Sequence, residues 1–145
     1  MNPFCDMWAL RSVVIDSDGG FWIVFALMAL LFPLRMLAGI VLAAAIHELG
    51  HIIALILCGG HVRRICLRVG GARIEATPLP HGQALLCILA GPAAGALTIL
   101  AWNRFPELAV AGLVQTGFNL LPLYPLDGGR ALRNICCKFR DFAVQ

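Results

Sequence analysis

Residues 36–58 read MLAGIVLAAAIHELGHIIALILC, an apolar run whose only carboxylate and imidazole side chains are His47, Glu48 and His51. A helix of about 20 apolar residues crosses a hydrocarbon core of about 30 Å, and this run has that length. A charged side chain at the centre of such a helix costs about 2.5–3.5 kcal/mol on insertion scales, so ionisable residues there are functional or paired by default. The run therefore predicts a membrane helix that carries a functional site.

The composition of the whole chain agrees with a membrane protein. Of its 145 residues, 60% are apolar and 13% are charged, against about 45–50% and about 25% in a typical soluble domain. So few charges cannot cover the surface of a small soluble protein. The apolar content excludes a disordered chain, and a net charge of +3 is too small to indicate nucleic-acid binding.

Three further apolar runs have the composition of membrane helices: Phe21–Leu34, Ala84–Trp102 and Leu108–Leu126. Residues 59–82 and the tail after the fourth run are rich in arginine and lysine, whereas residues 103–107 hold one Arg and one Glu. The positive-inside rule then places residues 59–82 and the C-terminus in the cytoplasm, and the N-terminus follows by parity. We therefore expect an all-α, multi-pass integral membrane protein with about four transmembrane helices.

Residues 65–76 depart from the helical pattern, because apolar residues alternate with polar or small ones before and after Gly70-Gly71. Two alternating runs around a glycine pair are typical of a β-hairpin. Pairing across the turn places Arg68, Arg73 and Glu75 on one face. A membrane-associated hairpin of this kind can lie on the bilayer, pack on the helix bundle, or accept an extended peptide at its edge. The opposite face holds six apolar side chains, those of Ile65, Leu67, Val69, Ala72, Ile74 and Ala76.

The pattern H-E-x-x-H in residues 47–51 indicates a metal site. On a helix, residues four apart differ by about 40° in rotation, so His47 and His51 project from one face and can share a metal ion. Glu48 stands about 100° from His47, where its carboxylate can hold and deprotonate a water beside the metal without being a ligand. The alternative is a buried His-Glu-His cluster that only bonds helix to helix.

Catalytic zinc usually takes three protein ligands and a water, so a third ligand is needed. Asp127 is our candidate because it follows the fourth run, near the cytoplasmic face that His51 approaches. Two prolines and two glycines break the helix around it, and non-helical backbone at membrane depth is tolerated only where it is buried in protein or lines a watery cavity. The alternative role for Asp127 is a turn carboxylate paired with Arg130. The other candidate ligands are His61, His81, Glu75, Glu107 and the cysteines.

Charge counting supports the proposed ligand set. A Zn²⁺ ion with two neutral imidazoles and the carboxylates of Glu48 and Asp127 has no net charge, whereas the two carboxylates alone would be an uncompensated pair in a low dielectric. The metal would also lower the pKa of its water towards about 7. We therefore expect one Zn²⁺ per chain.

The chain resembles the site-2 protease family of intramembrane zinc metalloproteases, peptidase family M50, through two motifs. These are H-E-L-G-H at residues 47–51 and N-L-L-P-L-Y-P-L-D-G-G-R at residues 119–130. With Leu89-Ala90-Gly91-Pro92, they are most similar to the stage IV sporulation protease type, and the resemblance covers roughly residues 36–135. Gly91 and Gly95 also form a small-xxx-small face, so we expect them to pack closely against a neighbouring helix.

The resemblance implies a role for each residue of the two motifs. His47, His51 and Asp127 would hold the zinc, and Glu48 would act as general base and general acid. Asn119 would contact the substrate or the developing oxyanion. From the residues alone, Asn119 is at least as well explained as a hydrogen bond between helices.

The resemblance also implies an enzyme that hydrolyses a peptide bond in or near the transmembrane segment of a membrane-protein substrate, as in regulated intramembrane proteolysis. We expect a single peptidase domain over residues 1–145, with its core at about 36–135 and no PDZ or CBS domain, in a bacterial plasma membrane. The expected partners are the lipid bilayer, a transmembrane substrate and a membrane regulator of unknown identity, but not nucleic acid. The alternative class is a non-catalytic membrane metal-binding or metal-transport protein.

Overall fold

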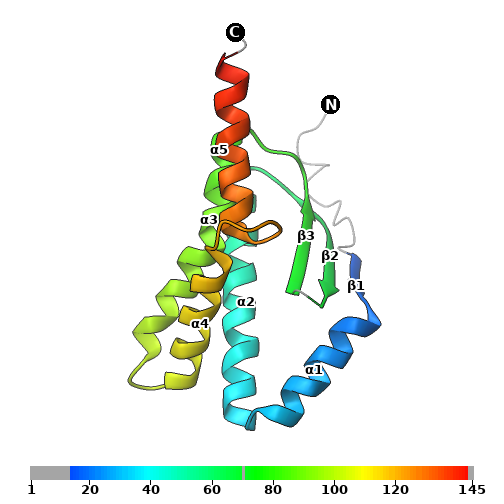
Figure 1. Ribbon diagram of the computed structural model, residues 1–145, viewed down its shortest axis with the longest axis vertical. Coiled ribbons are helices and arrows are strands. Elements are labelled where there is room, and N and C mark those ends of the chain that lie inside the picture. The colour runs from blue at the N-terminus through cyan, green and yellow to red at the C-terminus, as the bar shows by residue number, and fades with distance from the viewer. Residues whose placement is uncertain (1–13, 70, 144–145) are drawn as a thin grey trace, which may run out of the picture.

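The computed structural model describes residues 14–69 and 71–143 and is mostly helical, with a small sheet on one side (Figure 1). The predicted cytoplasmic N-terminus lies outside the described residues. The strands are β1 (Val14–Ser17), β2 (Val62–Arg68) and β3 (Gly71–Ala76). The helices are α1 (Gly19–Leu31), α2 (Leu34–Leu57), α3 (His81–Leu97), α4 (Pro106–Asn119) and α5 (Asp127–Ala143), with the short 3₁₀ helix η2 (Thr98–Ala101) continuing α3.

Helix α2 lies at the centre of the structure, with α3 and α4 on one side and the sheet on the other (Figure 1). Small residues let these helices approach closely: Ala43 of α2 is fully buried and packs with Leu108 and Ala111 of α4. A Cβ on Gly39 would lie 2.9 Å from the backbone carbonyl carbon of Glu107, so α4 begins against a bare glycine of α2. Packing through small residues is typical of membrane helices, because lipid provides no hydrophobic drive for their association.

Two helical stretches, α2 and residues 81–101, are long and apolar enough to cross a membrane. In each of them only 22% of the most apolar window is buried inside the structure, so most of its apolar surface faces outward. Helix α1 has 13 residues and α4 has 14, fewer than the about 20 of a full crossing. All four apolar runs therefore contain a helix, two of these helices have spanning length, and the four crossings stay a prediction.

The fourth apolar run is helical only as far as Asn119, the last residue of α4. Residues 120–126 are irregular, because Pro122 and Pro125 have no N–H to donate to a continuing helix. The chain then enters α5 at Asp127, so that α4 and α5 together run the height of the molecule with a non-helical segment between them (Figure 1).

The expectation that the glycine pair breaks the helix is wrong, since Gly128 and Gly129 lie in the first turn of α5. Because they have no side chain, the backbone of the preceding segment can approach them closely. A Cβ on Gly129 would lie 2.5 Å from the carbonyl carbon of Leu123, well inside ordinary van der Waals contact of about 3.5–4.0 Å. The glycines therefore let the irregular segment pack against the start of α5.

The predicted hairpin is present, with β2 (residues 62–68) antiparallel to β3 (residues 71–76). Its half-buried face contains the cross-strand pair of Ile65 and Ile74, as the alternation predicts. Val69 departs from the prediction, because its side chain is 59% exposed. The ladder ends at Arg68, so the backbone at Val69 no longer follows the strand alternation.

A third strand that was not predicted, β1, pairs in parallel with residues 64–67 of β2. It has only four residues and no local turn links it to its partner, so the sequence carries little signal for it. Arg68 secures its end, with guanidinium nitrogens 3.7 Å from Asp16 and 3.3 Å from Asp18. Asp18 also caps α1 by accepting the N–H of Phe21 at 2.8 Å. This hydrogen bond, together with Arg68, lowers the pKa of Asp18.

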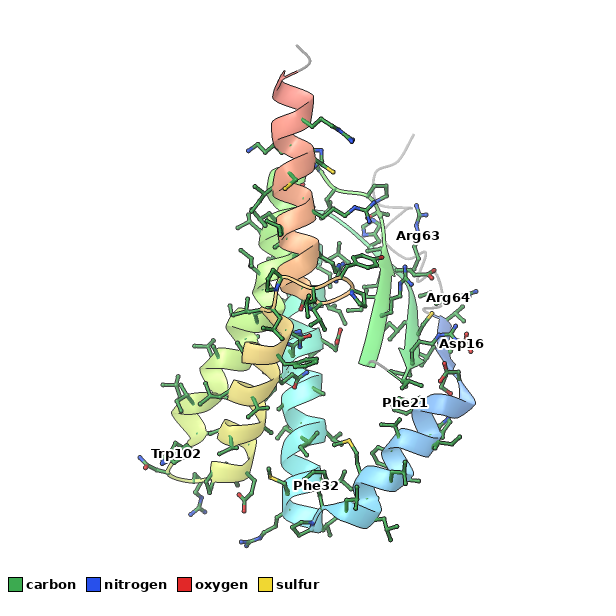
Figure 2. The ribbon with its side chains drawn as sticks, in the orientation of Figure 1. Asp16, Phe21, Phe32, Arg63, Arg64 and Trp102 are labelled. Atoms are coloured by element: carbon green, nitrogen blue, oxygen red, sulfur yellow. The ribbon has the colours of Figure 1, made fainter. Side chains whose placement is uncertain are left out.

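The arginine-rich segments include the hairpin, which reaches down to the middle of the molecule, and α5 (Figure 1). In Figure 1 the end of α2 and the start of α3 lie in the upper half of the molecule, and α5 continues beyond them to the top. Figure 2 shows Phe32 and Trp102 near the opposite end and Arg63 and Arg64 beside the sheet. Exposed tryptophan at the edge of an apolar region is typical of a membrane interface. The placement of residues 59–82 and the C-terminal tail on one side of a membrane stays a prediction.

Candidate metal centre

The three predicted metal ligands come together where α2 meets the start of α5. His47 Nε2 lies 3.0 Å from Asp127 Oδ2, and His51 Nε2 lies 3.2 Å from the same oxygen. The two Nε2 atoms are 3.2 Å apart. Within the described ranges, no other group of three His, Cys, Asp or Glu side chains converges in this way.

This triangle of donor atoms fits a tetrahedral zinc ion. Zinc bonds to imidazole nitrogen and carboxylate oxygen are about 2.0–2.2 Å long, so ligand atoms in a tetrahedral site lie about 3.3–3.5 Å apart. The observed edges of 3.0 and 3.2 Å come within a few tenths of an ångström of that spacing. Three protein ligands leave a fourth position for water or substrate, as in catalytic zinc sites.

A backbone carbonyl fixes the tautomer of His51. Its Nδ1–H donates to the carbonyl oxygen of Cys87 in α3 at 2.8 Å, so Nε2 keeps the lone pair that a metal ligand needs. Gly91, one turn further along α3, leaves room for the ring, because the three atoms nearest to a Cβ built there all belong to the His51 imidazole. Gly91 therefore has the packing role expected of it, and what it packs against is a candidate metal ligand.

Asp127 uses its two oxygens for different partners and is only 5% exposed. Oδ2 faces the two histidines, whereas Oδ1 accepts a hydrogen bond from the Arg130 guanidinium at 3.1 Å. The pairing with Arg130 that the sequence offers as an alternative therefore occurs together with the ligand geometry. Loss of a partner that orients a ligand typically lowers metal affinity by about 10- to 100-fold.

The ligand atoms face a cavity of about 800 Å³ whose walls come from four helices, the segment before α5 and the sheet. Glu48 is half-buried and lines this cavity together with the three ligands, a placement that suits a general base. Asn119, at the end of α4, also lines it. Strand β3 forms one wall through residues 71–76. The cavity thus brings the predicted site residues and the hairpin into one space.

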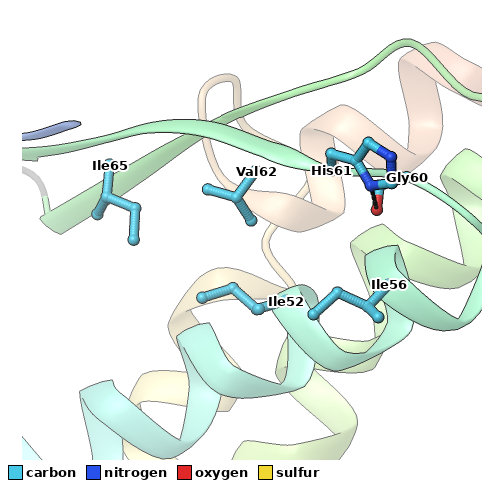
Figure 3. Close-up of a pocket in the computed structure, with 6 residues that line it drawn as sticks. All are labelled: Ile52, Ile56, Gly60, His61, Val62 and Ile65. Atoms are coloured by element: carbon cyan, nitrogen blue, oxygen red, sulfur yellow. Dashed lines mark hydrogen bonds between the residues drawn. The ribbon is translucent and has the colours of Figure 1, made fainter. Parts of the chain in front are cut away.

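Among the described residues, the other candidates for the third ligand are not part of the ligand group. Glu75 lines the β3 wall of the cavity but is not part of the ligand group. Glu107 lies in the first turn of α4, and His81 begins α3. His61 lines a separate apolar pocket of about 330 Å³ between α2 and β2 (Figure 3), where its Nδ1 donates to the carbonyl oxygen of Gly60 at 2.9 Å.

Two contributors to the site were not predicted. The carbonyl of Cys87 acts through the backbone, so no side-chain pattern could indicate it. Gln115 lines the cavity one turn before Asn119, and its position as a polar residue inside an apolar run was the signal that could have identified it.

The motif and the similarity of the chain to known proteins both point to a class of protein. A helix that carries H-E-x-x-H is typical of zinc metalloproteases. No protein-family model matches the chain. It is 30% identical to stage IV sporulation protein FB of Bacillus subtilis, over 77% of this chain and 43% of the relative. It is also 30% identical to zinc metalloprotease MJ0392 of Methanocaldococcus jannaschii, over 66% of this chain and 32% of the relative.

Among solved structures, the chain is similar to the site-2 protease from Methanocaldococcus jannaschii. The TM-score is 0.72 at 25% identity, and the match covers 86% of this chain and 67% of that one. The chain belongs to the site-2 protease family, which confirms the resemblance seen in the two motifs. It spans less than half the length of the curated relatives it matches.

Proposed function

We propose that the protein is a zinc metalloendopeptidase that hydrolyses a peptide bond in or near the transmembrane segment of a membrane-protein substrate. The observation that carries the proposal is the triangle of His47, His51 and Asp127, which opens into a cavity that also holds Glu48 and the β3 wall. A metal ion there accounts for two carboxylates among apolar helices, because it neutralises their charge. A relative named zinc metalloprotease supports the same function.

The chain supplies the groups that the reaction needs. His47, His51 and Asp127 would hold one zinc ion, which supplies Lewis-acid polarisation of the scissile carbonyl and lowers the pKa of water in the site. Glu48 takes the proton of the attacking water and then delivers it to the leaving amine, so one carboxylate is both general base and general acid. The Cys87 carbonyl holds the ligand ring of His51 in place throughout.

Asn119 contacts the substrate in this proposal. It lines the cavity from the last turn of α4 and is half-buried. Its side-chain amide has no hydrogen-bond partner among the residues the structure describes, which favours a substrate contact over a bond between helices. An amide N–H aimed into a cavity can stabilise the negative charge that develops on a carbonyl oxygen under attack.

The edge of β3 holds the substrate in an extended form in this proposal. The strand order β1-β2-β3 leaves one edge of β3 unpaired within the described sheet, and residues 71–76 line the cavity. A helical substrate hides its carbonyls in i to i−4 hydrogen bonds and must unwind before attack. Strand addition to β3 provides hydrogen-bond partners for the unwound backbone.

We further propose that residues 36–135 form the peptidase core, in a multi-pass membrane protein whose arginine-rich end faces the cytoplasm. The spanning length of α2 and of residues 81–101 supports this placement, as does the positive-inside rule. His51 lies six residues before Leu57, the end of α2, and hence about 9 Å from it along the axis. Water therefore has a short path to the ligands. A transmembrane substrate and a membrane regulator are the partners proposed.

Co-expression with candidate membrane-tethered substrates tests this function. The wild type is expected to cleave, and Glu48→Gln is expected to lose at least about 100-fold in rate, because an amide cannot accept the proton. Glu107→Gln makes the same change at the far end of α4 and should cleave as the wild type does. Cleavage that persists in Glu48→Gln would contradict the mechanism. Zinc retention without cleavage by any variant would indicate the non-catalytic metal-binding class instead.

A further inference from the structure

The two histidines of the candidate metal centre differ in how their second ring nitrogen is held. His51 Nδ1 donates to the Cys87 carbonyl at 2.8 Å. His47 is 2% exposed, and its Nδ1 is a buried polar atom with no hydrogen-bond partner in the described part of the chain. With Nε2 turned towards Asp127, Nδ1 must carry the ring proton if His47 is to bind a metal. A metal-ligating histidine almost always donates that proton to a second group.

A threonine hydroxyl lies on the side of His47 where this partner is missing. The space is left by Gly95 of α3: a Cβ built there would lie 2.5 Å from Thr116 Oγ1 and 3.5 Å from His47 Nδ1. Thr116 of α4 is buried, so both polar atoms face one small enclosed gap. Any side chain at position 95 would fill this gap and separate them.

The hydroxyl of Thr116 is free to accept. It donates its single proton to the carbonyl oxygen of Pro92, at 3.4 Å, which leaves both lone pairs of Oγ1 unused. This distance is longer than the about 2.5–3.0 Å that is usual for O–H···O hydrogen bonds. The bond to Pro92 therefore restrains the hydroxyl only weakly. Closure of the gap requires a movement of the threonine side chain or of the imidazole.

We propose that Thr116 is a positioning residue of the metal centre, whose Oγ1 accepts the Nδ1–H of His47 when the metal is bound. It serves His47 as the Cys87 carbonyl serves His51, and the resulting chain of hydrogen bonds runs from His47 through Thr116 to Pro92. Gly95 is the residue that makes room for it. This inference rests on the zinc site of the proposed function, but it concerns zinc affinity and not proteolysis.

Thr98 provides a matched control for the same crossing of α3 and α4. It is also buried, at 5% exposed, and its hydroxyl also donates to a backbone carbonyl, that of Gly95, at 2.7 Å. Its side chain packs against Gly112, and its hydroxyl bonds to Gly95 and not to a metal ligand. Removal of the hydroxyl at position 98 therefore disturbs the same helix packing without touching the ligand.

The test measures zinc affinity of the full chain in detergent by competition with a chromophoric chelator. Thr116→Val is expected to bind zinc about 10- to 100-fold more weakly than the wild type, the range for loss of a ligand's second partner. Thr116→Ser keeps the hydroxyl and should restore most of the affinity, and Thr98→Val should bind as the wild type does. Thermal unfolding of the metal-free variants identifies any that fail to fold.

Three results would overturn the inference: wild-type affinity in Thr116→Val, an equal loss in Thr98→Val, or no rescue by Thr116→Ser. His47→Ala marks the affinity of a site that lacks the ligand itself. If the wild type bound zinc no better than His47→Ala, the metal site and this inference would fail together. If the wild type bound zinc in the predicted order of variants but cleaved no substrate, only the proposed protease function would fail.

Discussion

Gly91→Ala is the substitution that probes the packing behind the metal centre most sharply. Gly91 is buried in α3 directly against the imidazole of His51. Alanine favours a helix more than glycine does, so backbone propensity alone predicts a stabilising change. The contact with His51 predicts the opposite. Helix propensity therefore cannot explain a loss of zinc affinity, so such a loss would report the contact with His51.

The magnitude follows from the distances at Gly91. The new methyl group would clash with Nε2 and Cε1 of His51 and would lie 2.7 Å from Cδ2, whereas carbon atoms prefer about 3.5–4.0 Å. The ring must therefore move by about 1 Å, several times the about 0.2 Å within which metal–ligand distances are held. Overpacking of this kind costs about 1–3 kcal/mol, which corresponds to about 5- to 150-fold in zinc affinity.

Chelator competition on the purified full chain measures this loss, and proteolysis of a tethered substrate should fall with it. Gly82→Ala is the control, because it makes the same change in the first turn of the same helix where nothing lies within 4 Å of the new Cβ. It should leave zinc affinity unchanged. Wild-type zinc affinity and cleavage in Gly91→Ala would refute the idea that α3 positions His51.

Two further predictions concern charged residues outside the ligand group. Arg130→Met should weaken zinc binding by up to about tenfold. This is the low end for loss of a ligand's partner, because water can replace a guanidinium that is 48% exposed. Chelator competition measures the affinity, and an unchanged value would argue against a role of Arg130 in orienting Asp127. In the folded state, the hydrogen bond from Phe21 and the nearby Arg68 lower the pKa of Asp18. The Asp18 carboxylate therefore stabilises the fold at pH values above its ordinary pKa. This stabilisation is lost as the pH falls through the lowered pKa of the folded state. Asp18→Asn should therefore remove part of the acid destabilisation seen in thermal unfolding below about pH 4, and an unchanged pH dependence would contradict it.

Much of the fold follows from local signals in the sequence. Each apolar run contains a helix, and the alternation around residues 65–76 predicts the hairpin, because both patterns reflect which neighbours share a face. The misses depend on contacts between distant parts of the chain. Strand β1 exists only through pairing with β2, and the start of α5 at Asp127 depends on how residues 120–126 pack against Gly128 and Gly129.

The candidate site divides in the same way. The spacing of His47 and His51 places both on one helix face. Asp127 follows the fourth apolar run, where a buried charge is costly without a partner. Local geometry and this cost were therefore sufficient to propose the three ligands. The partners of these ligands could not be predicted, because a carbonyl such as that of Cys87 has no side-chain signature. Their identification needs the packing of α3 against α2.

Zinc content and cleavage measured on the same purified samples test the central claim most directly. The wild type and Glu48→Gln should each hold one zinc per chain, Asp127→Ala should hold none, and only the wild type should cut a transmembrane substrate. A wild type that cleaves without zinc, or an Asp127→Ala variant that keeps both zinc and activity, would contradict the account.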